Sequence, residues 1–389
     1  MEWLKSKISS DSNLEMPYNW LKLEYFEALN VLFRIENALR VFVYIILKGE
    51  IGEGWADLSL INDDGKQTTI GAIAKKRLAQ DKNYAYLGYI LSSPLVHLTS
   101  GELIRIITSE SYWPFFKPHF QGAKEIIKTK LDEIGNVRNS LAHFRPIRRE
   151  DIELVKSNSI HILSSIEKLI VQFVNCPDIV PTNTEDKWYK ELSILKSGYC
   201  NLGFTQSIDE RWVKIRVSIS CVIISSSGIE GYMTKNVTNV RTDKLLITYP
   251  KLTGIAISVC ENNPSSFMHG EIKFRKSITL TFLRSKLESD LEAIKDNFIK
   301  LMSQIDSEIL MVEQDTLARG KIIELVSVTI TKEKTTYYLT KHSPFITELK
   351  EDTPVEFWGS LTYAPDNFIT STHIYPWMPT EISEEELPF

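Results

Sequence analysis

The spacing of apolar residues changes near residue 180, and this change limits the folds open to the chain more than any other feature. Between Tyr18 and about Val174 the apolar residues recur every three or four positions, which is typical of amphipathic helices. Beyond residue 190 apolar and polar residues alternate, as they do from Val213 to Ile223, which is typical of strands with one face toward a core. The sequence therefore predicts an α+β protein of several domains, helical first and β-rich afterwards.

Two runs define the helical half most clearly. Their apolar residues are Leu29, Leu32, Phe33, Leu39, Val43 and Ile46 in the first run and Ile152, Val155, Ile162, Ile166, Leu169 and Phe173 in the second. Helices with such faces pack together into bundles, so an all-α bundle is predicted over residues 1–176. Pro177 and Pro181, with small polar residues around them, indicate a linker over residues 177–190.

The second half is predicted to hold two further domains. Strands are predicted at residues 244–249, 254–260, 271–282, 321–331, 335–340, 355–363 and 368–375. One long helix is predicted from residue 285 to about 312, and its spacing fits either a coiled-coil seam or a helix packed on a sheet. We expect a β-rich domain over 191–316 that ends in this helix, a small OB-like barrel or sandwich over 317–379, and an acidic tail over 380–389.

Charge and hydropathy exclude several classes of protein. The chain has 45 Lys and Arg against 50 Asp and Glu, so it has no chain-wide cationic surface, and any nucleic-acid site must be a local patch. The longest apolar run covers residues 41–47, whereas crossing a bilayer takes about 20 residues. The N-terminus lacks the apolar core of a signal peptide. We therefore expect a cytoplasmic protein with no membrane partner.

The sequence contains no recognisable metal or cofactor motif. Its four cysteines stand at positions 176, 200, 221 and 260, too far apart in sequence for a zinc knuckle, an iron–sulfur site or a redox pair. The motifs HExxH, GxxxxGK[ST] and GxGxxG do not occur. We therefore expect neither a metal nor a cofactor.

One segment carries a focused positive charge. Residues 138–149 contain four arginines and no acidic residue, although residues 1–180 hold 22 basic and 22 acidic side chains. The four are Arg138, Arg145, Arg148 and Arg149. Pro146 disfavours helical geometry at the preceding residue, so the helix through this segment is predicted to end near Phe144 or Arg145. His143 then lies in the last turn, with Asn139 one turn earlier on the same face.

These residue types fit one kind of chemistry. An imidazole exchanges protons near neutral pH, and a guanidinium binds two phosphate oxygens at once. With both groups beside a phosphodiester, RNA can be cleaved without a metal, because its own 2′-hydroxyl is the nucleophile. The bare spacing between Arg138 and His143 is weak support, because it arises by chance roughly once in a chain of this composition.

Upstream, Glu36 lies on the apolar stripe of a helix. A carboxylate there needs a partner, and Arg40 is well placed one turn later. A structural ion pair between Glu36 and Arg40 is the first interpretation. The alternative is that Glu36 points into a catalytic cleft and holds Arg138 or His143 in position.

The full strings resemble a known family. Arg138-Asn139-Ser140-Leu141-Ala142-His143, preceded about 100 residues earlier by Ile35-Glu36-Asn37-Ala38-Leu39-Arg40, resembles the HEPN superfamily of helical ribonuclease domains over about residues 18–175. The resemblance implies a metal-independent endoribonuclease that forms a homodimer through this domain, so that two Arg-x4-His motifs line one cleft. It also implies that His143 is the acid or base, that Arg138 contacts the scissile phosphate and that Asn139 orients them. Arg145, Arg148 and Arg149 are then RNA-backbone contacts, and otherwise an ordinary solvated surface.

Two functions follow as hypotheses. In the first, the chain is a toxin or antiphage effector of the abortive-infection type that cleaves RNA, including tRNA as a candidate target, and its β-rich half binds a trigger or an inhibitor protein. In the second, the helical domain is a non-catalytic HEPN scaffold for a binding or sensor protein. Substitution of His143 by alanine separates them, because only the first hypothesis needs the imidazole.

Overall fold

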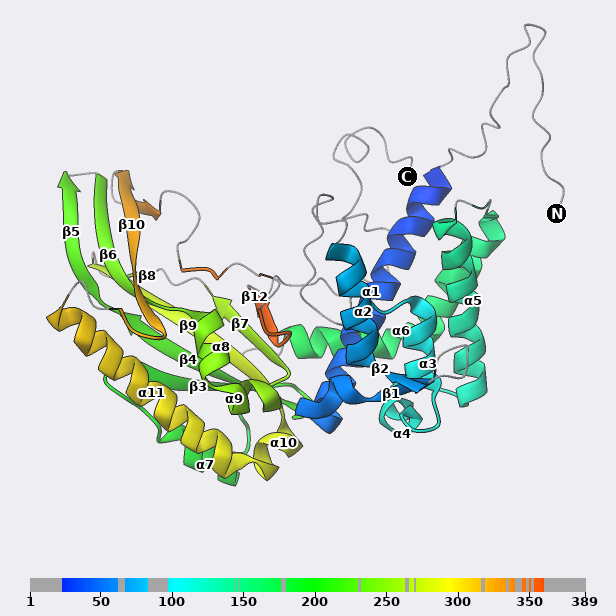
Figure 1. Ribbon diagram of the computed structural model, residues 1–389, viewed down its shortest axis with the longest axis horizontal. Helices are drawn as coiled ribbons and strands as arrows, with labels where there is room; N and C mark the ends of the chain where they lie inside the picture. Colours follow the sequence, from blue (N-terminus) through cyan, green and yellow to red (C-terminus); the bar gives the residue numbers. More distant parts are fainter. Residues whose placement is uncertain are drawn as a thin grey trace, which may run out of the picture. The chain divides into compact units, whose positions relative to one another are not determined.

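The chain divides into two compact units. The computed structural model describes residues 23–61, 67–82, 97–143, 145, 147–175, 180–229, 232–262, 266–268, 271–315, 319–333, 336–339, 345–347, 350 and 353–359 (Figure 1). Unit 1 comprises residues 1–44, 98–171 and 365–389, and unit 2 comprises residues 45–97 and 172–364. The division falls inside two helices, and not in the segment 177–190 that the sequence predicts as a linker.

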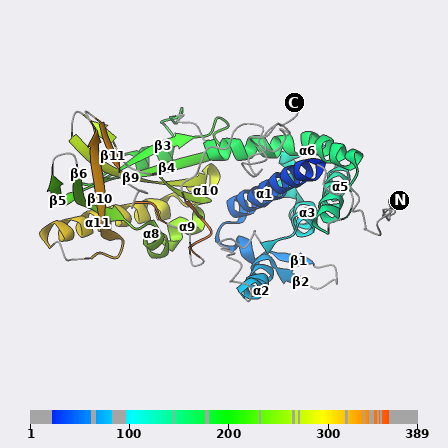
Figure 2. The ribbon, with the colours of Figure 1, turned by 90° about the horizontal axis from the view of Figure 1, so that it is seen from above.

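Unit 1 is built from helices, as the apolar spacing predicts. Its elements are α1 (Leu23–Ile51), α3 (Ser100–Thr108), α4 (Trp113–Phe116), the 3-10 turn η5 (Lys117–His119), α5 (Lys124–Ala142) and α6 (Arg149–Asn175), of which α1 and α6 continue into unit 2. In both views α1, α3, α5 and α6 lie alongside one another (Figures 1 and 2). All six apolar residues predicted on the face of α6 are buried.

The predicted face of α1 is only partly correct. Leu32 and Leu39 are buried, but Leu29 and Phe33 are 55% and 47% exposed. Further along α1, Phe42 is fully buried among aromatic rings, and its centroid lies 5.5 Å from that of Phe116. The helix therefore packs through one stripe and leaves its neighbouring stripe at the surface.

The region predicted as all-α contains a small hairpin, which corrects that prediction. After the 3-10 turn η2 (Glu53–Asp57), strand β1 (Ser59–Ile61) pairs antiparallel with β2 (Gln67–Thr69), and α2 (Ile70–Lys82) follows. The helical periodicity hides this hairpin because its strands are only three residues long. The sequence Asn-Asp-Asp-Gly at 62–65 is a turn signal that points to it.

Unit 2 contains two larger sheets. The six-stranded sheet has the order β12-β7-β9-β4-β3, with β8 paired to β9, and the four-stranded sheet has the order β11-β10-β6-β5. The strands are β3 (Cys200–Gln206), β4 (Trp212–Cys221), β5 (Ile223–Ile229), β6 (Tyr232–Val240), β7 (Ser258–Asn262), β8 (Ser266–Met268), β9 (Glu271–Leu283), β10 (Ile323–Glu333), β11 (Thr336–Leu339) and β12 (Phe357–Gly359). Every pairing within these sheets is antiparallel except that of β12 with β7.

A helix covers the six-stranded sheet and forms its core. The predicted long helix is divided into α10 (Arg284–Ser289) and α11 (Leu291–Gln314) at Asp290, whose φ of −107° and ψ of 18° are not helical. Phe298 and Ile305 of α11 are fully buried in one core cluster with Val217 and Leu280 of the sheet. Of the two alternatives for this segment, the structure shows the helix packed on a sheet (Figure 1).

Two predicted segments differ from the structure. Residues 244–249, predicted as a strand, belong to α8 (Thr242–Thr248), which α9 (Pro250–Ile255) follows. Leu245 and Leu246 are adjacent and both buried, which a helix allows and a strand with one solvated face does not. Within the predicted linker, α7 (Lys187–Ser193) begins, and Trp188 is fully buried in the core of unit 2.

The boundary predicted at residues 316 and 317 runs through a sheet. Strand β10, from the segment expected to form a separate barrel, pairs along nine residues with β6 from the preceding segment. The predicted strand at 368–375 and the acidic tail at 380–389 lie outside the described residues. Among the described helices, none has the length and apolar content needed to span a bilayer.

Candidate active site

Helix α5 positions the predicted catalytic residues. Its buried residues Ile127, Leu131 and Ile134 hold the helix in unit 1. The helix ends at Ala142, two residues before the predicted end, and His143 caps it with its backbone N–H bonded to the Asn139 carbonyl at 3.1 Å. The sequence explains this end, because the residue before a proline avoids helical geometry and Pro146 follows Arg145.

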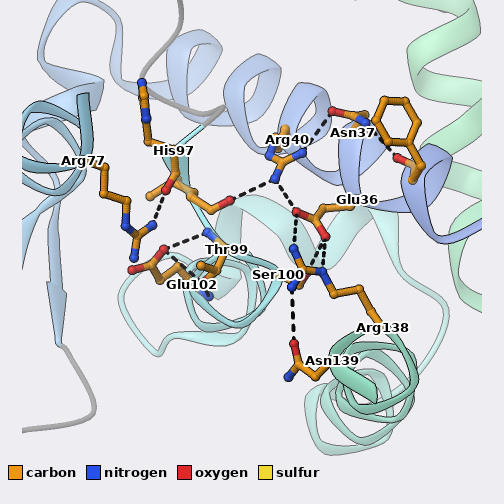
Figure 3. A network of polar contacts seen from close by, with 12 residues as sticks. Glu36, Asn37, Arg40, Arg77, His97, Thr99, Ser100, Glu102, Arg138 and Asn139 are labelled. Carbon is orange, nitrogen blue, oxygen red and sulfur yellow. Dashed lines mark hydrogen bonds and ion pairs between the residues drawn. The ribbon is translucent and has the colours of Figure 1, made fainter. Parts of the chain in front are cut away.

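Glu36 of α1 binds Arg138 of α5. Arg138 donates from Nε to Glu36 Oε2 at 2.8 Å and from Nη2 to Glu36 Oε1 at 3.4 Å (Figure 3). Asn139, the next residue, accepts a weaker bond from Arg138 Nη1 at 3.5 Å. A carboxylate that accepts two guanidinium N–H groups fixes the plane of the guanidinium as well as its position. Arg138 is thus held in one orientation while 34% of its side chain stays exposed.

Arg40 binds the other side of the same carboxylate. It forms an ion pair with Glu36 Oε1, donates to the Leu98 carbonyl at 3.2 Å and to Asn37 Oδ1 at 3.0 Å (Figure 3). Both interpretations of Glu36 that the sequence leaves open are therefore present together, since Glu36 pairs with Arg40 and holds Arg138. The three side chains carry two positive charges and one negative charge, which leaves a net positive site.

Ser100 completes the network, and sequence reasoning missed it. Its hydroxyl donates to Glu36 Oε2 at 2.7 Å and is buried there. The residue begins α3, where Thr99 and Glu102 form a capping box. The pattern Thr-x-x-Glu at 99–102 is readable in the sequence and predicts a helix start at Ser100, but nothing local indicates that this start faces Glu36.

The electrostatics of the network favour the charged form of Glu36. Burial alone would raise the pKa of this carboxyl, but the Ser100 hydrogen bond and the charges of Arg40 and Arg138 outweigh it, so the pKa lies below its usual value. Burial also lowers the pKa of Arg40, and the Glu36 carboxylate opposes that shift. Glu36 is therefore ionised at neutral pH and keeps both arginines in place.

The remaining predicted residues stand outside this network. His143 is exposed at the end of α5, and in the described part of the chain its imidazole forms no hydrogen bond. Arg145, Arg148 and Arg149 are also exposed, and Arg148 pairs with Asp151 at the start of α6. The structure thus brings together Glu36, Arg40, Arg138 and Asn139, and it places His143 one helical turn beyond Asn139.

The chemistry of this site is that of an anion-binding site beside an imidazole. A fixed and partly exposed guanidinium suits a phosphate group, and an exposed imidazole can give or take a proton. No group of three or more His, Cys, Asp and Glu side chains within the described ranges is placed to hold a metal ion. Comparison of the chain with protein-family models, with curated proteins and with solved structures finds no match in any of the three.

Proposed function

We propose that the chain is a metal-independent endoribonuclease of the HEPN type. The observation that carries the proposal is the Glu36–Arg138 pair, which fixes a partly exposed guanidinium on the helix that ends at the exposed His143. Such a guanidinium can bind the nonbridging oxygens of a phosphodiester and stabilise the charge that develops on them. Asn139, in contact with Arg138 and one turn before His143, orients the two groups.

The proposed reaction needs only RNA and these side chains. The 2′-oxygen attacks the adjacent phosphorus, the new O2′–P bond forms and the P–O5′ bond breaks, which leaves a 2′,3′-cyclic phosphate and a 5′-hydroxyl. His143 takes the proton of the 2′-hydroxyl or gives one to the leaving oxygen. A homodimer would supply a second copy of the motif, so that one imidazole acts as the base and the other as the acid.

The proposal extends to the biological role. We infer a cytoplasmic toxin or antiphage effector of the abortive-infection type, with RNA such as tRNA as its substrate. Arg145, Arg148 and Arg149 would contact the RNA backbone, and the β-rich half would bind a trigger or an inhibitor protein. The net positive charge of the Glu36, Arg40 and Arg138 cluster and the arginines that follow it support RNA as the partner.

The alternative function is a non-catalytic binding or sensor protein on the same scaffold. One observation favours it, because Glu36 already occupies the Nε and Nη2 donors of Arg138, as in a purely structural ion pair. The two functions differ in what they need from His143, which has no structural role visible in its side-chain contacts.

Incubation of the purified chain with total RNA and with tRNA in EDTA tests the proposal. We expect cleavage with 2′,3′-cyclic phosphate ends, lost in His143→Ala and retained in His161→Ala, a matched control because His161 is an exposed histidine of α6. Equal melting temperatures of the variants would show that folding is unchanged. Cleavage that survives His143→Ala or that EDTA abolishes would refute the proposal.

A further inference from the structure

A polar cavity of about 440 Å3 lies within unit 2, far along the sequence from the candidate active site. Its walls come from the end of β6, the start of β10, helix α8 and the segment 346–354 before β12. The side chains that matter to its chemistry are Asn239, Arg241, Asp243, Lys244, Glu324 and Lys350. Cavities of this volume are within the range that holds small molecules in proteins.

Asn239 leaves a buried acceptor at this cavity. The residue is 4% exposed, and its Nδ2 donates to Glu324 Oε1 at 3.0 Å across the β6–β10 pair. Its Oδ1 is buried and accepts no hydrogen bond from any described residue. A buried carbonyl oxygen without a donor is unfavourable, so an N–H or O–H group of a ligand would be stabilised there.

The charged side chains around the cavity favour an anion. Arg241 pairs with both carboxylates of the lining, at 3.3 Å from Asp243 and 3.8 Å from Glu324. Lys244 reaches Asp243 only at 4.0 Å. With Lys350, the described lining carries three cations and two carboxylates. Guanidinium and ammonium groups converging on one cavity are suited to a phosphate.

The cavity walls are fixed from behind by a buried ion pair. Lys276 of β9 and Glu261 of β7 are almost fully buried, with Nζ 2.9 Å from Oε2. Glu261 accepts hydrogen bonds from Thr242 at the start of α8 and from the backbone N–H of Thr347, and Lys276 donates to the Phe345 carbonyl at 2.8 Å. The two mobile-looking connections that line the cavity are thus anchored to the sheet, so a ligand meets a preformed site.

We propose that this cavity binds a small phosphorylated molecule that also carries N–H or O–H donors, of the size and kind of a nucleoside monophosphate. Arg241, Lys244 and Lys350 hold the phosphate, and Asn239 Oδ1 accepts from a base or sugar group. The proposal concerns a site distinct from the arginine and histidine of α5, and it holds or fails independently of RNA cleavage.

Isothermal titration calorimetry with the full chain tests the site. The probes are AMP, GMP, CMP and UMP, with adenosine, ribose 5-phosphate and inorganic phosphate to separate the phosphate from the donor groups. We expect at least one nucleotide to bind at one molecule per chain, its nucleoside and inorganic phosphate to bind at least 10-fold more weakly, and ribose 5-phosphate to rank between them.

Charge-reversal variants assign the binding to this cavity. Lys244→Glu and Lys350→Glu should each weaken the nucleotide at least 10-fold, whereas Lys251→Glu, an exposed lysine of α9 outside the cavity, should leave it unchanged. Melting temperatures within a degree of the parent would show intact folding. Absence of binding by every phosphorylated probe at millimolar concentration, equal binding to both charge-reversal variants, or inorganic phosphate binding as tightly as the nucleotide would each overturn the proposal.

Discussion

Glu36 and Arg138 are 102 positions apart in the sequence, and a hydrogen bond of 2.8 Å joins them between α1 and α5. Glu36 also receives Ser100 from α3, so one carboxylate ties three helices of unit 1 together. A single negative charge that serves two arginines is under strong demand, because loss of it leaves two partly buried cations facing each other. Stability and site geometry therefore depend on the same side chain.

The variant Glu36→Gln should be markedly less stable. The amide keeps the shape of the side chain but removes the charge that balances Arg40 and Arg138, and we expect the free energy of unfolding to fall by about 1–3 kcal/mol. Urea unfolding followed by circular dichroism measures this change. Asp132→Asn on the exposed face of α5 is the matched control and should change stability by less than about 0.5 kcal/mol. Equal stability of the two variants would show that the cluster contributes nothing.

The stabilisation from Glu36 should depend on pH in one direction. Its folded-state pKa is below the ordinary value of 4.5, so its contribution is complete above that value and is lost as pH falls through the folded-state pKa. The difference in unfolding free energy between the wild type and Glu36→Gln should be constant from about pH 7 to pH 5 and shrink below about pH 4.5. A difference that grows on acidification would contradict the lowered pKa.

Arg138→Lys should remove RNA cleavage although it keeps the charge. One ammonium cannot form the paired bonds to Glu36 and also offer a fork of donors to a phosphate. We expect the cleavage rate to drop roughly 100-fold or more, in line with the loss of a donor to a developing oxyanion. RNA binding, measured by filter retention, should change much less. The reverse exchange Lys168→Arg, at an exposed position of α6, is the control, and equal loss in both variants would count against a specific role for Arg138.

The fold was predictable where spacing is local and long. The apolar residues of α6 follow the helical period over 27 residues, and all six predicted positions are buried. The alternation in β4 likewise survives, since Val213, Ile215, Val217 and Ile219 share the buried face. In each case one face packs along the whole element, so the pattern in the sequence mirrors the environment.

What failed depends on contacts between distant segments. The pairing of β10 with β6 joins residues about 90 positions apart, and no local signal shows that a strand completes a sheet begun before a long helix. The same holds for the site. The motif around Arg138 and the neighbour pair of Glu36 and Arg40 were predictable from spacing, but the position of Ser100 on the Glu36 carboxylate follows only from how α3 packs.

The buried pair of Lys276 and Glu261 should be strongly coupled. Removal of one partner leaves the other charge buried, so Lys276→Met should lower the free energy of unfolding by about 3–5 kcal/mol. The double variant Glu261→Gln with Lys276→Met should lose less than the sum of the single losses, by at least about 1 kcal/mol. Lys251→Met controls for loss of a lysine at the surface. Additive losses in the double-mutant cycle would show that the two charges act independently.

The described cysteines should be unreactive in the folded protein. Burial raises the pKa of Cys200 and of Cys260 to about 12 and that of Cys221 to about 11, so at pH 8 almost none of each thiol is ionised. Since the thiolate is the nucleophile, alkylation by iodoacetamide should be at least about 100-fold slower than for an ordinary exposed thiol. Peptide mass spectrometry after timed labelling measures each site, and labelling in urea supplies the control because unfolding removes the burial. Fast labelling of any of the three in the native protein would mean that its surroundings open readily, since a neutral thiol in a packed core can react only through such opening.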